Sequence, residues 1–332
     1  MNFCIYPAGA WGTALALHLV RENHTVTLVP RELDHALEMA SSRVNRRYLD
    51  GVELPRDVQL GMELAPSLME ADVLVLACPS RYLRGVCREI RSQLYQAEQL
   101  EVVLTLCKGL EEGTNALPTA VVAEELPQFA HGALSGPSFA SQVAAGQPTA
   151  LVLSTNLPAD KNEYLQQALS GERVRVYTSD DLTGVELGGC LKNVYAIAVG
   201  MCDGLGLRDN TKAALLTRAL HEMVRVGEAL GGKRETFYGL TGFGDLVLTC
   251  NGAESRNRTF GERVARGESA EQLIAAMTVE GYRTTACFHR ICQDKGVEAP
   301  ILEQIYQILF EGRSLREAIP ALMGRQLKPE RA

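Results

Sequence analysis

The sequence contains no run of about twenty apolar residues, so no membrane span is expected. It has no sustained block of lysine or arginine and a formal net charge of −7, which argues against a nucleic-acid partner. The nine cysteines are scattered and never form a C-x-x-C pair, so neither a disulfide framework nor a structural zinc site is expected. Met1-Asn2-Phe3 leads directly into a strand-like segment, without the features of a signal peptide. We therefore expect a soluble, cytoplasmic protein with reduced thiols and no stable membrane association.

Low-complexity tracts and internal repeats are also absent, and 332 residues are too many for one ordinary core, so two domains are expected. The first half alternates short apolar runs with helix-length segments such as 11–22 and 81–94. This alternation indicates a parallel sheet covered on both faces, whose ligands bind at the carboxyl ends of the strands. The strand-like runs are Phe3–Tyr6, Thr25–Val29, Val73–Ala77, Val102–Leu106 and Ala150–Leu153.

After about Thr178 the pattern changes to helix following helix. Three- and four-residue spacing marks one buried stripe, formed by Ala213, Leu216, Leu220, Met223, Gly227 and Leu230. Similar periodicity recurs at 270–277, 282–293 and 301–309. We predict an α/β fold: a Rossmann domain with a doubly wound parallel sheet at 1–178, then an all-helical substrate-binding domain at 179–332.

A glycine-rich turn follows the first predicted strand, Pro7-Ala8-Gly9-Ala10-Trp11-Gly12, and a helix begins near Thr13. It matches the dinucleotide fingerprint G-x-G-x-x-G, with proline in place of the first glycine. Gly9 allows close approach of a pyrophosphate, Gly12 allows tight helix-to-strand packing, and the helix N-terminus offers free N–H groups. Pro7 removes one backbone donor and fixes φ, so the turn is expected to be altered. A purely structural turn is the alternative, which the position at the start of a βαβ unit disfavours.

The end of the second predicted strand bears on the choice between NADPH and NADH. It reads Val29-Pro30-Arg31, and an arginine there suits the 2′-phosphate of NADPH, whereas an acidic residue suits the free ribose of NADH. Arg31 favours NADPH, although Glu32 points the other way and a solvated arginine at a helix start is nearly as well supported. The predicted cofactor is NADPH, or NADH.

Lys192 is the only positive charge in a helix-length segment, Glu186–Ala198. Gly188 and Gly189 lie one turn before it and cost roughly 1 kcal/mol each in helix propensity, which indicates that another group approaches the backbone closely. Burial lowers a lysine pKa and a carboxylate raises it, so such a lysine can be tuned for proton transfer. The alternative is a lysine whose stem lies along an apolar helix while its charge reaches water.

Other segments offer polar groups for a ligand. Gly239–Leu246 is predicted as a glycine-rich loop that presents Asp245, or as a helix cap. Ser255-Arg256-Asn257 supplies a hydroxyl, a guanidinium and an amide suited to a phosphate, or forms a surface loop. Lys108 and Ser138 follow strand-like segments, where ligands of this fold collect.

Taken together, these pieces resemble NAD(P)-dependent glycerol-3-phosphate dehydrogenase of the bacterial type, along almost the whole chain. The matching segments, in order, are AGAWGTALA, CKGLE, LSGPSFA, ELGGCLKNVYAIAVG, GLTGFGDLVLTC, SRN and VEGYRT. The resemblance implies reversible reduction of dihydroxyacetone phosphate to sn-glycerol 3-phosphate, which supplies glycerophospholipid synthesis. It also implies a C-terminal domain like that of 6-phosphogluconate dehydrogenase, and a homodimer.

By this resemblance, Lys192 protonates the developing alkoxide, Lys108 polarises the substrate, and Asp245 holds Lys192, with Asn193 and Thr249 in support. The implied substrate-binding residues are Lys108, Gly136, Ser138, Lys192, Asp245, Ser255, Arg256 and Asn257. The implied cofactor-binding residues are Gly9, Ala10, Trp11, Gly12, Arg31, Lys108, Ala140, Arg256, Thr278 and Glu280. No metal is implied.

Pro7 and Thr278 depart from the family pattern, where glycine and an apolar residue are common. One alternative function is a related β-hydroxyacid or 6-phosphogluconate-type dehydrogenase, which the Ser-Arg-Asn segment disfavours. Another is a cofactor-binding regulatory protein without turnover. The presence of Lys108, Lys192 and Asp245 disfavours it, because a sensor needs no proton donor.

Overall fold

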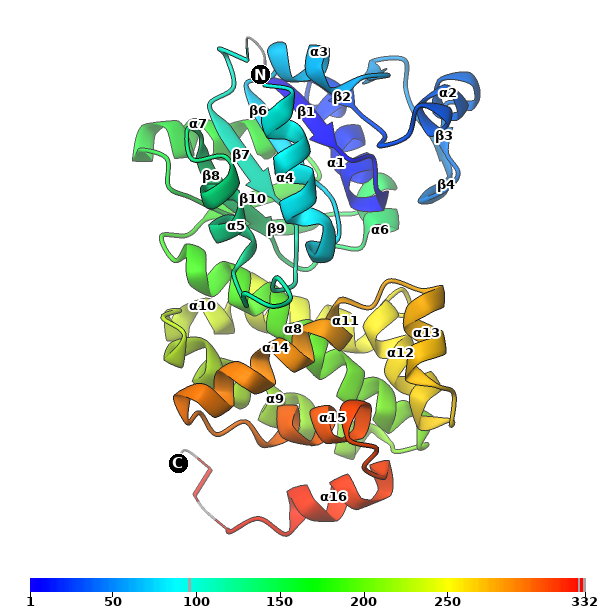
Figure 1. Ribbon diagram of the computed structural model, residues 1–332, viewed down its shortest axis with the longest axis vertical. Helices are drawn as coiled ribbons and strands as arrows, with labels where there is room; N and C mark the ends of the chain where they lie inside the picture. Colours follow the sequence, from blue (N-terminus) through cyan, green and yellow to red (C-terminus); the bar gives the residue numbers. More distant parts are fainter. Residues whose placement is uncertain (95–96, 328, 331–332) are drawn as a thin grey trace.

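The computed structural model describes residues 1–94, 97–327 and 329–330. A part built around a sheet is followed along the chain by a part built from helices (Figure 1). The last strand of the sheet ends at Thr178, and the first helix of the helical part begins at Leu182. Of the predicted helical domain, residues 328 and 331–332 lie outside the described residues.

Eight strands of the described chain form one sheet in the order β10-β9-β8-β7-β6-β1-β2-β5. Their bounds are β1 Asn2–Tyr6, β2 Thr25–Leu28, β5 Val58–Leu60, β6 Val73–Leu76, β7 Val102–Thr105, β8 Ala130–Ser135, β9 Thr149–Thr155 and β10 Val174–Thr178. Two short strands, β3 Val44–Asn45 and β4 Leu49–Glu53, form a separate antiparallel pair.

The sheet is parallel except where β9 runs antiparallel to β8. The segment 136–148 between these strands contains only the five-residue helix α6, Ala140–Ala144, which is too short to cross over the sheet as a parallel connection requires. The predicted strand at Ala150–Leu153 therefore exists, but with reversed direction relative to β8.

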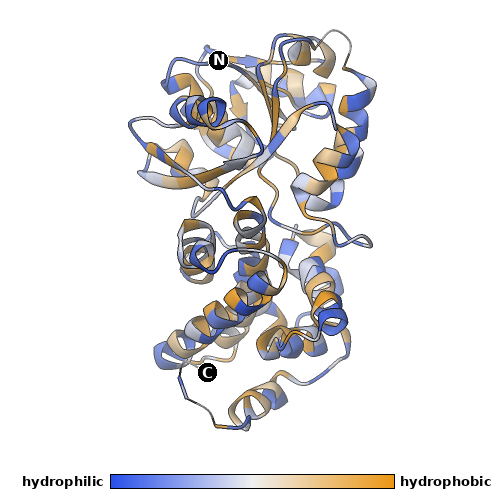
Figure 2. Cartoon of the chain, turned by 90° about the vertical axis from the view of Figure 1, so that its left-hand side faces the viewer, coloured by the Kyte–Doolittle hydropathy of each residue, from blue (hydrophilic) through white to orange (hydrophobic). Residues whose placement is uncertain are grey.

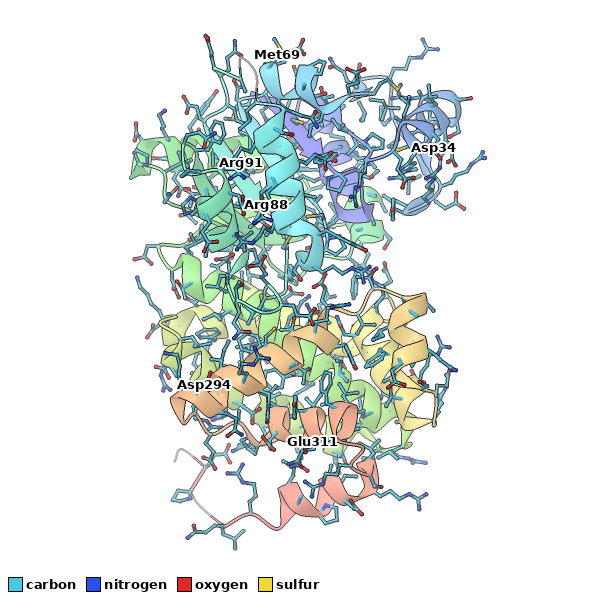
Figure 3. All side chains as sticks on the ribbon, viewed as in Figure 1. Asp34, Met69, Arg88, Arg91, Asp294 and Glu311 are labelled. Carbon is cyan, nitrogen blue, oxygen red and sulfur yellow. The ribbon has the colours of Figure 1, made fainter. Side chains whose placement is uncertain are left out.

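Helices cover both faces of the sheet, as predicted from the continuous apolar strands. Successive residues of β1 belong to opposite cores: Ile5 packs in one buried cluster and Cys4 in the other. The covering helices are α1 Ala10–Arg21, α2 Leu33–Ser42, α3 Leu64–Met69, α4 Leu83–Ser92, α5 Pro118–Glu125 and α7 Ala159–Leu169. On α4, Arg88 and Arg91 (labelled in Figure 3) pair with Glu125 of α5 at 2.9 and 3.0 Å.

The helical part surrounds α8, Leu182–Gly204, the one described helix that is long and apolar enough to span a membrane. Of its most apolar window, 94% is buried within the protein, so α8 is a core helix. The other helices of this part alternate polar and apolar residues (Figure 2). They are α9 Asp209–Ala229, α10 Arg234–Tyr238, α11 Asp245–Asn251, α12 Arg256–Ala265, α13 Ala270–Ala276, α14 Glu280–Lys295, α15 Pro300–Phe310 and α16 Leu315–Met323.

Two predictions for the helical part need correction. Ala213, predicted in the buried stripe of α9, is exposed, whereas Met223 and Gly227 further along the stripe are buried. The predicted glycine-rich loop is instead a π-helical turn, Leu240–Gly244, that continues into α11. Glycine is required there because a Cβ on Gly242 would lie 2.1 Å from the Phe237 carbonyl oxygen.

Candidate active site

Asp245 joins two lysines where the sheet-containing and helical parts meet. It is the first residue of α11 and is only 1% exposed. Its Oδ1 accepts a hydrogen bond from Lys192 Nζ at 2.7 Å, and its Oδ2 accepts one from Lys108 Nζ at 2.6 Å. Lys192 Nζ also donates to Thr249 Oγ1 at 2.8 Å. Lys192 lies on α8 and Lys108 follows β7, so one carboxylate connects the two parts of the chain.

Burial and neighbouring charges set the protonation states in this cluster. Burial lowers the pKa of Lys192 to about 8, although Asp245 favours the ammonium form. Burial by itself raises the pKa of Asp245, but the two ammonium groups outweigh it and hold that pKa below its usual value. The cluster therefore contains an ionised carboxylate and a lysine that holds its proton less tightly than it would in water. Such a lysine can transfer a proton near neutral pH.

The glycine pair before Lys192 lets other backbone and side-chain atoms approach α8, as the sequence indicated. A Cβ on Gly188 would lie 2.7 Å from the Thr241 carbonyl oxygen, closer than real Cβ contacts. A Cβ on Gly189 would lie 3.4 Å from Lys108 Cγ. Gly188 thus allows the π-helical turn Leu240–Gly244 to come close to the helix that carries Lys192. Gly189 does the same for Ser135, whose Oγ would lie 3.1 Å from a Cβ at that position.

Asn193 continues the network away from the lysines. Its Nδ2 donates to the Lys108 carbonyl oxygen at 2.9 Å, and its Oδ1 accepts from Asn257 Nδ2 at 2.8 Å. Asn257 Oδ1 in turn accepts from Gly281 N at 2.9 Å. This chain of amides fixes the backbone at Lys108 relative to α12 and α14.

Gly136 and Ser138 lie on the other side of Lys108. The Gly136 carbonyl oxygen accepts from Lys108 Nζ at 2.9 Å, and the φ of Gly136 is 136°, a conformation that favours glycine. Ser138 Oγ accepts from Trp11 Nε1 at 3.1 Å. The structure therefore places Gly136 against Lys108, and Ser138 links Gly136 to Trp11 in the first turn of α1.

Ser255, Arg256 and Asn257 form the N-terminal end of α12. Ser255 is 3% exposed and caps this helix, because its Oγ accepts from Arg258 N at 3.2 Å. Arg256 is exposed, and no ion pair joins its guanidinium to another part of the described chain. Free N–H groups of a ten-residue helix beside an unpaired guanidinium suit an anionic group such as a phosphate.

The turn after β1 keeps the packing expected of a dinucleotide fingerprint despite Pro7. Gly9 is extended and immediately precedes α1, which has no side-chain cap at its N-terminus. A Cβ on Gly12 would lie 2.8 Å from Ala77 Cβ, so only glycine allows α1 to pack this closely on the sheet. The first N–H groups of α1, beginning at Ala10, are therefore positioned for a phosphate.

The other predicted cofactor residues lie at separate strand and helix ends. Arg31 is exposed after β2, with its guanidinium carbon 5.9 Å from the centre of the Tyr82 ring. Ala140 begins α6, and half-buried Thr278 lies two residues before Glu280, the first residue of α14.

Glu280 is held by a residue that the sequence analysis did not identify. Its Oε1 accepts from Ser80 N at 3.2 Å and its Oε2 from Ser80 Oγ at 2.5 Å. A Cβ on Gly109 would lie 2.5 Å from Glu280 Oε2, so the carboxylate rests against that glycine. Burial raises the pKa of Glu280. The available signal was the position of Ser80 after β6, where ligands of this fold collect.

A second unpredicted contact across the two parts joins Glu186 to Thr119. Glu186 lies on α8 and is 3% exposed. It accepts from Thr119 N at 2.8 Å and from Thr119 Oγ1 at 2.5 Å. Burial raises the pKa of Glu186 to about 7. The signal in the sequence was a carboxylate within the mainly apolar segment that forms α8, which also carries Lys192 and Asp203.

A cavity of about 350 Å³ lies elsewhere, between α8, α9, α15 and α16. It is mainly apolar, and none of the predicted site residues lines it. The chemistry suggested by the lysine–aspartate cluster therefore does not take place in this cavity.

Both parts of the chain match models of one protein family. Residues 2–161 match NAD-dependent glycerol-3-phosphate dehydrogenase N-terminus, and residues 181–320 match NAD-dependent glycerol-3-phosphate dehydrogenase C-terminus. The chain is 44% identical over 333 residues to glycerol-3-phosphate dehydrogenase [NAD(P)+] from Thiobacillus denitrificans, covering 99% of this chain and all of the relative. The corresponding protein of Dechloromonas aromatica is 43% identical over 335 residues, with both chains fully covered.

Solved structures agree with these matches. The crystal structure of glycerol-3-phosphate dehydrogenase from Coxiella burnetii superposes with a TM-score of 0.90 at 39% identity, covering 98% of this chain and 99% of the other. The enzyme of the same name from Saccharomyces cerevisiae has a TM-score of 0.83 at 24% identity, covering 98% and 99%, and so shows the shared fold.

Proposed function

The chain belongs to the family of NAD-dependent glycerol-3-phosphate dehydrogenases, and from this premise we propose how its residues carry out the reaction. The reaction is the reversible reduction of dihydroxyacetone phosphate to sn-glycerol 3-phosphate with NADPH or NADH. Its product supplies glycerophospholipid synthesis. The bound dinucleotide supplies the hydride, and the protein must supply a proton and hold both molecules.

Lys192 donates the proton to the substrate oxygen as negative charge develops on it. Burial lowers the pKa of Lys192 to about 8, so the ammonium form still predominates at pH 7. Asp245 and Thr249 orient Nζ through bonds of 2.7 and 2.8 Å. After transfer, the neutral amine takes up a proton from water, and the reverse reaction uses that amine as base.

Lys108 places a second positive charge beside the reacting carbonyl. Its ammonium is held by Asp245 and by the Gly136 carbonyl oxygen at 2.6 and 2.9 Å. A preorganised cation stabilises an oxyanion most effectively where water is excluded. Asn193 supports this role because it binds the Lys108 carbonyl oxygen.

The substrate phosphate binds at the N-terminal end of α12. Arg256 has an unpaired guanidinium there, and Ser255 and Asn257 are held in place by bonds to Arg258 N and Asn193. Gly136 and Ser138 contact the substrate from the opposite side, next to Lys108. Neutral dihydroxyacetone lacks the group that this site recognises.

The cofactor lies along the carboxyl ends of the strands. The N-terminus of α1 has no side-chain cap and would hold a pyrophosphate through its free N–H groups. The close packing of α1 on the sheet at Gly12 supports this role. Residues at this edge would hold the dinucleotide, namely Gly9, Ala10, Trp11, Gly12, Arg31, Lys108, Ala140, Arg256, Thr278 and Glu280. Arg31 favours the 2′-phosphate of NADPH.

The assignment of roles to domains follows from these positions. Residues 1–178 bind the cofactor, and residues 179–332 supply the proton donor and the phosphate site. All nine cysteines are free thiols, which supports a cytoplasmic location. A homodimer is part of the same proposal, on the basis of the family.

The observation that carries the proposal is the single buried carboxylate that binds Lys108 and Lys192 together. The test is oxidation of NADPH or NADH with dihydroxyacetone phosphate by Lys192→Met, with the exposed surface variant Lys161→Met as control. We expect the first variant to lose turnover while binding NADPH normally, and the second to match wild type. Equal use of unphosphorylated dihydroxyacetone by the wild type would contradict the phosphate site.

A further inference from the structure

Arg47 makes three ion pairs with the segment that follows β2. It lies between β3 and β4, and its Nη1 is 2.9 Å from Glu32 Oε2. Its Nη2 is 2.7 Å from Asp34 Oδ2, and its Nε is 3.1 Å from Glu38 Oε2. Asp34 is labelled in Figure 3 at the outer edge of the sheet-containing part. Each guanidinium nitrogen thus contacts a different carboxylate of α2 or its N-cap.

The position of Arg47 is fixed by a buried anchor two residues earlier. Asn45 is 0% exposed, and its Nδ2 donates to the Ala8 carbonyl oxygen at 3.0 Å and to Thr13 Oγ1 at 2.8 Å. His35 Nε2 contacts Asn45 Oδ1 at 3.0 Å from α2. Ala8 and Thr13 flank the turn that binds the dinucleotide in the proposed function. Arg47 is therefore tied to the same turn as the cofactor.

One of the three carboxylates that Arg47 contacts is Glu32, which neighbours Arg31. The residue at the end of the second strand distinguishes the two cofactors: a carboxylate there repels a 2′-phosphate, and an arginine attracts it. Here both kinds of residue are adjacent. Arg31 has no ion pair within the described chain. Its guanidinium carbon lies 5.9 Å from the centre of the Tyr82 ring, and that of Arg81 lies 4.5 Å from the same centre. The preference for NADPH over NADH thus depends on how far the negative charge of Glu32 is offset by a neighbouring cation.

We propose that Arg47 is a positioning residue for cofactor choice: it holds Glu32 and offsets part of its negative charge, so that Arg31 can bind the 2′-phosphate of NADPH. This inference rests on the proposed function, which places the adenosine end of the cofactor beside Arg31. Arg47 itself does not need to contact the cofactor. Its effect is to remove a repulsion that would otherwise act on NADPH and leave NADH unaffected.

The test uses the variants Arg47→Gln, Glu32→Gln and the double variant. For each, binding of NADP+ and of NAD+ is measured by quenching of Trp11, the single tryptophan, and kcat/KM is measured with NADPH and NADH. We expect Arg47→Gln to weaken binding of NADP+ by about fivefold or more without changing NAD+ binding, with a smaller effect at high salt. Glu38→Gln is the matched control, since it removes another partner of Arg47 farther along α2 and should leave the cofactor ratio unchanged.

The double variant decides the mechanism. If Arg47 acts through Glu32, the added Glu32→Gln change restores the NADP+ to NAD+ ratio to that of wild type. Equal weakening of both cofactors by Arg47→Gln, or no rescue in the double variant, would overturn the inference. Binding ratios do not require turnover, so an inactive wild type would refute the proposed reaction while the role of Arg47 was still measured.

Discussion

Replacement of Asp245 by asparagine removes the charge that holds the two lysines together. The carboxylate is 1% exposed and accepts bonds of 2.6 and 2.7 Å from Lys108 and Lys192. Leaving a buried charge without its partner costs about 3–5 kcal/mol, and here two ammonium groups of like charge would face each other. The Lys192 ammonium relieves this cost by losing its proton, since burial already lowers its pKa to about 8.

The direction of the effect on activity follows from how Asp245 shifts the pKa of Lys192. Asp245 raises the pKa of Lys192, so its loss moves that pKa further down. Reduction requires the ammonium form, and the alkaline limb of the pH profile should therefore move to lower pH by at least about one unit. At neutral pH, kcat/KM for dihydroxyacetone phosphate should fall about 100- to 1000-fold, equivalent to about 3–4 kcal/mol.

The assay is consumption of the reduced nicotinamide, followed from about pH 6 to about pH 10 in both proteins. Thr249→Val is the control, because it removes the other oxygen bound to Lys192 Nζ, at 2.8 Å, without a change of charge. It should lower kcat/KM about tenfold, the worth of one hydrogen bond of about 1.4 kcal/mol, with the alkaline limb unmoved. An Asp245→Asn profile whose limb stays at the wild-type pH would refute the reasoning.

Three further predictions concern other parts of the chain. Arg256→Ala should lower kcat/KM for dihydroxyacetone phosphate by the factor that corresponds to about 2 kcal/mol of transition-state stabilisation, because the exposed guanidinium no longer binds the phosphate. Steady-state kinetics that show no change would remove Arg256 from the phosphate site. Burial raises the pKa of Glu186 to about 7, so the folded protein becomes less stable as pH rises from about 4.3 to 7 and the buried carboxyl ionises. Glu186→Gln should therefore raise the melting temperature at pH 8 but not at pH 4. Burial also raises the pKa of Glu222 to about 7, but both of its oxygens accept backbone N–H groups, from Ile301 and Leu302. In Glu222→Gln the amide nitrogen would face one of these donors, so this control variant should not raise the melting temperature at pH 8. Gly12→Ala should destabilise by about 1–3 kcal/mol in denaturant unfolding, since its Cβ would lie 2.8 Å from Ala77 Cβ, whereas Gly85→Ala, with open space in α4, should stabilise by about 0.5–1 kcal/mol.

Local sequence patterns were sufficient to predict many of the helices and strands and which of their faces are buried. Continuous apolar strands predicted a sheet covered on both faces, and Cys4 and Ile5 indeed enter opposite cores. The unusual Gly188-Gly189 pair correctly predicted a close approach to α8, because helix propensity is a property of the chain itself. The direction of β9 could not be predicted in this way, since it depends on the connection across segment 136–148.

Contacts between distant residues left no comparable periodic signal. Lys108 and Asp245 are 137 positions apart, and nothing in either segment alone indicates that one carboxylate binds both lysines. The pairs Ser80–Glu280 and Thr119–Glu186 were missed for the same reason. The role of Asp245 was available before the structure only through the resemblance of motifs to a known family.

Three of the polar contacts between the halves of the chain limit how such enzymes can be recombined. Lys108 binds Asp245, Ser80 binds Glu280, and Thr119 binds Glu186, each pair with one member before β10 ends and one after α8 begins. A chimaera joined at segment 179–181 would inherit the two members of every pair from different parents. Such a hybrid keeps these contacts only if both parents contain all three pairs. Parents for such chimaeras should therefore be chosen by these polar pairs rather than by overall sequence identity.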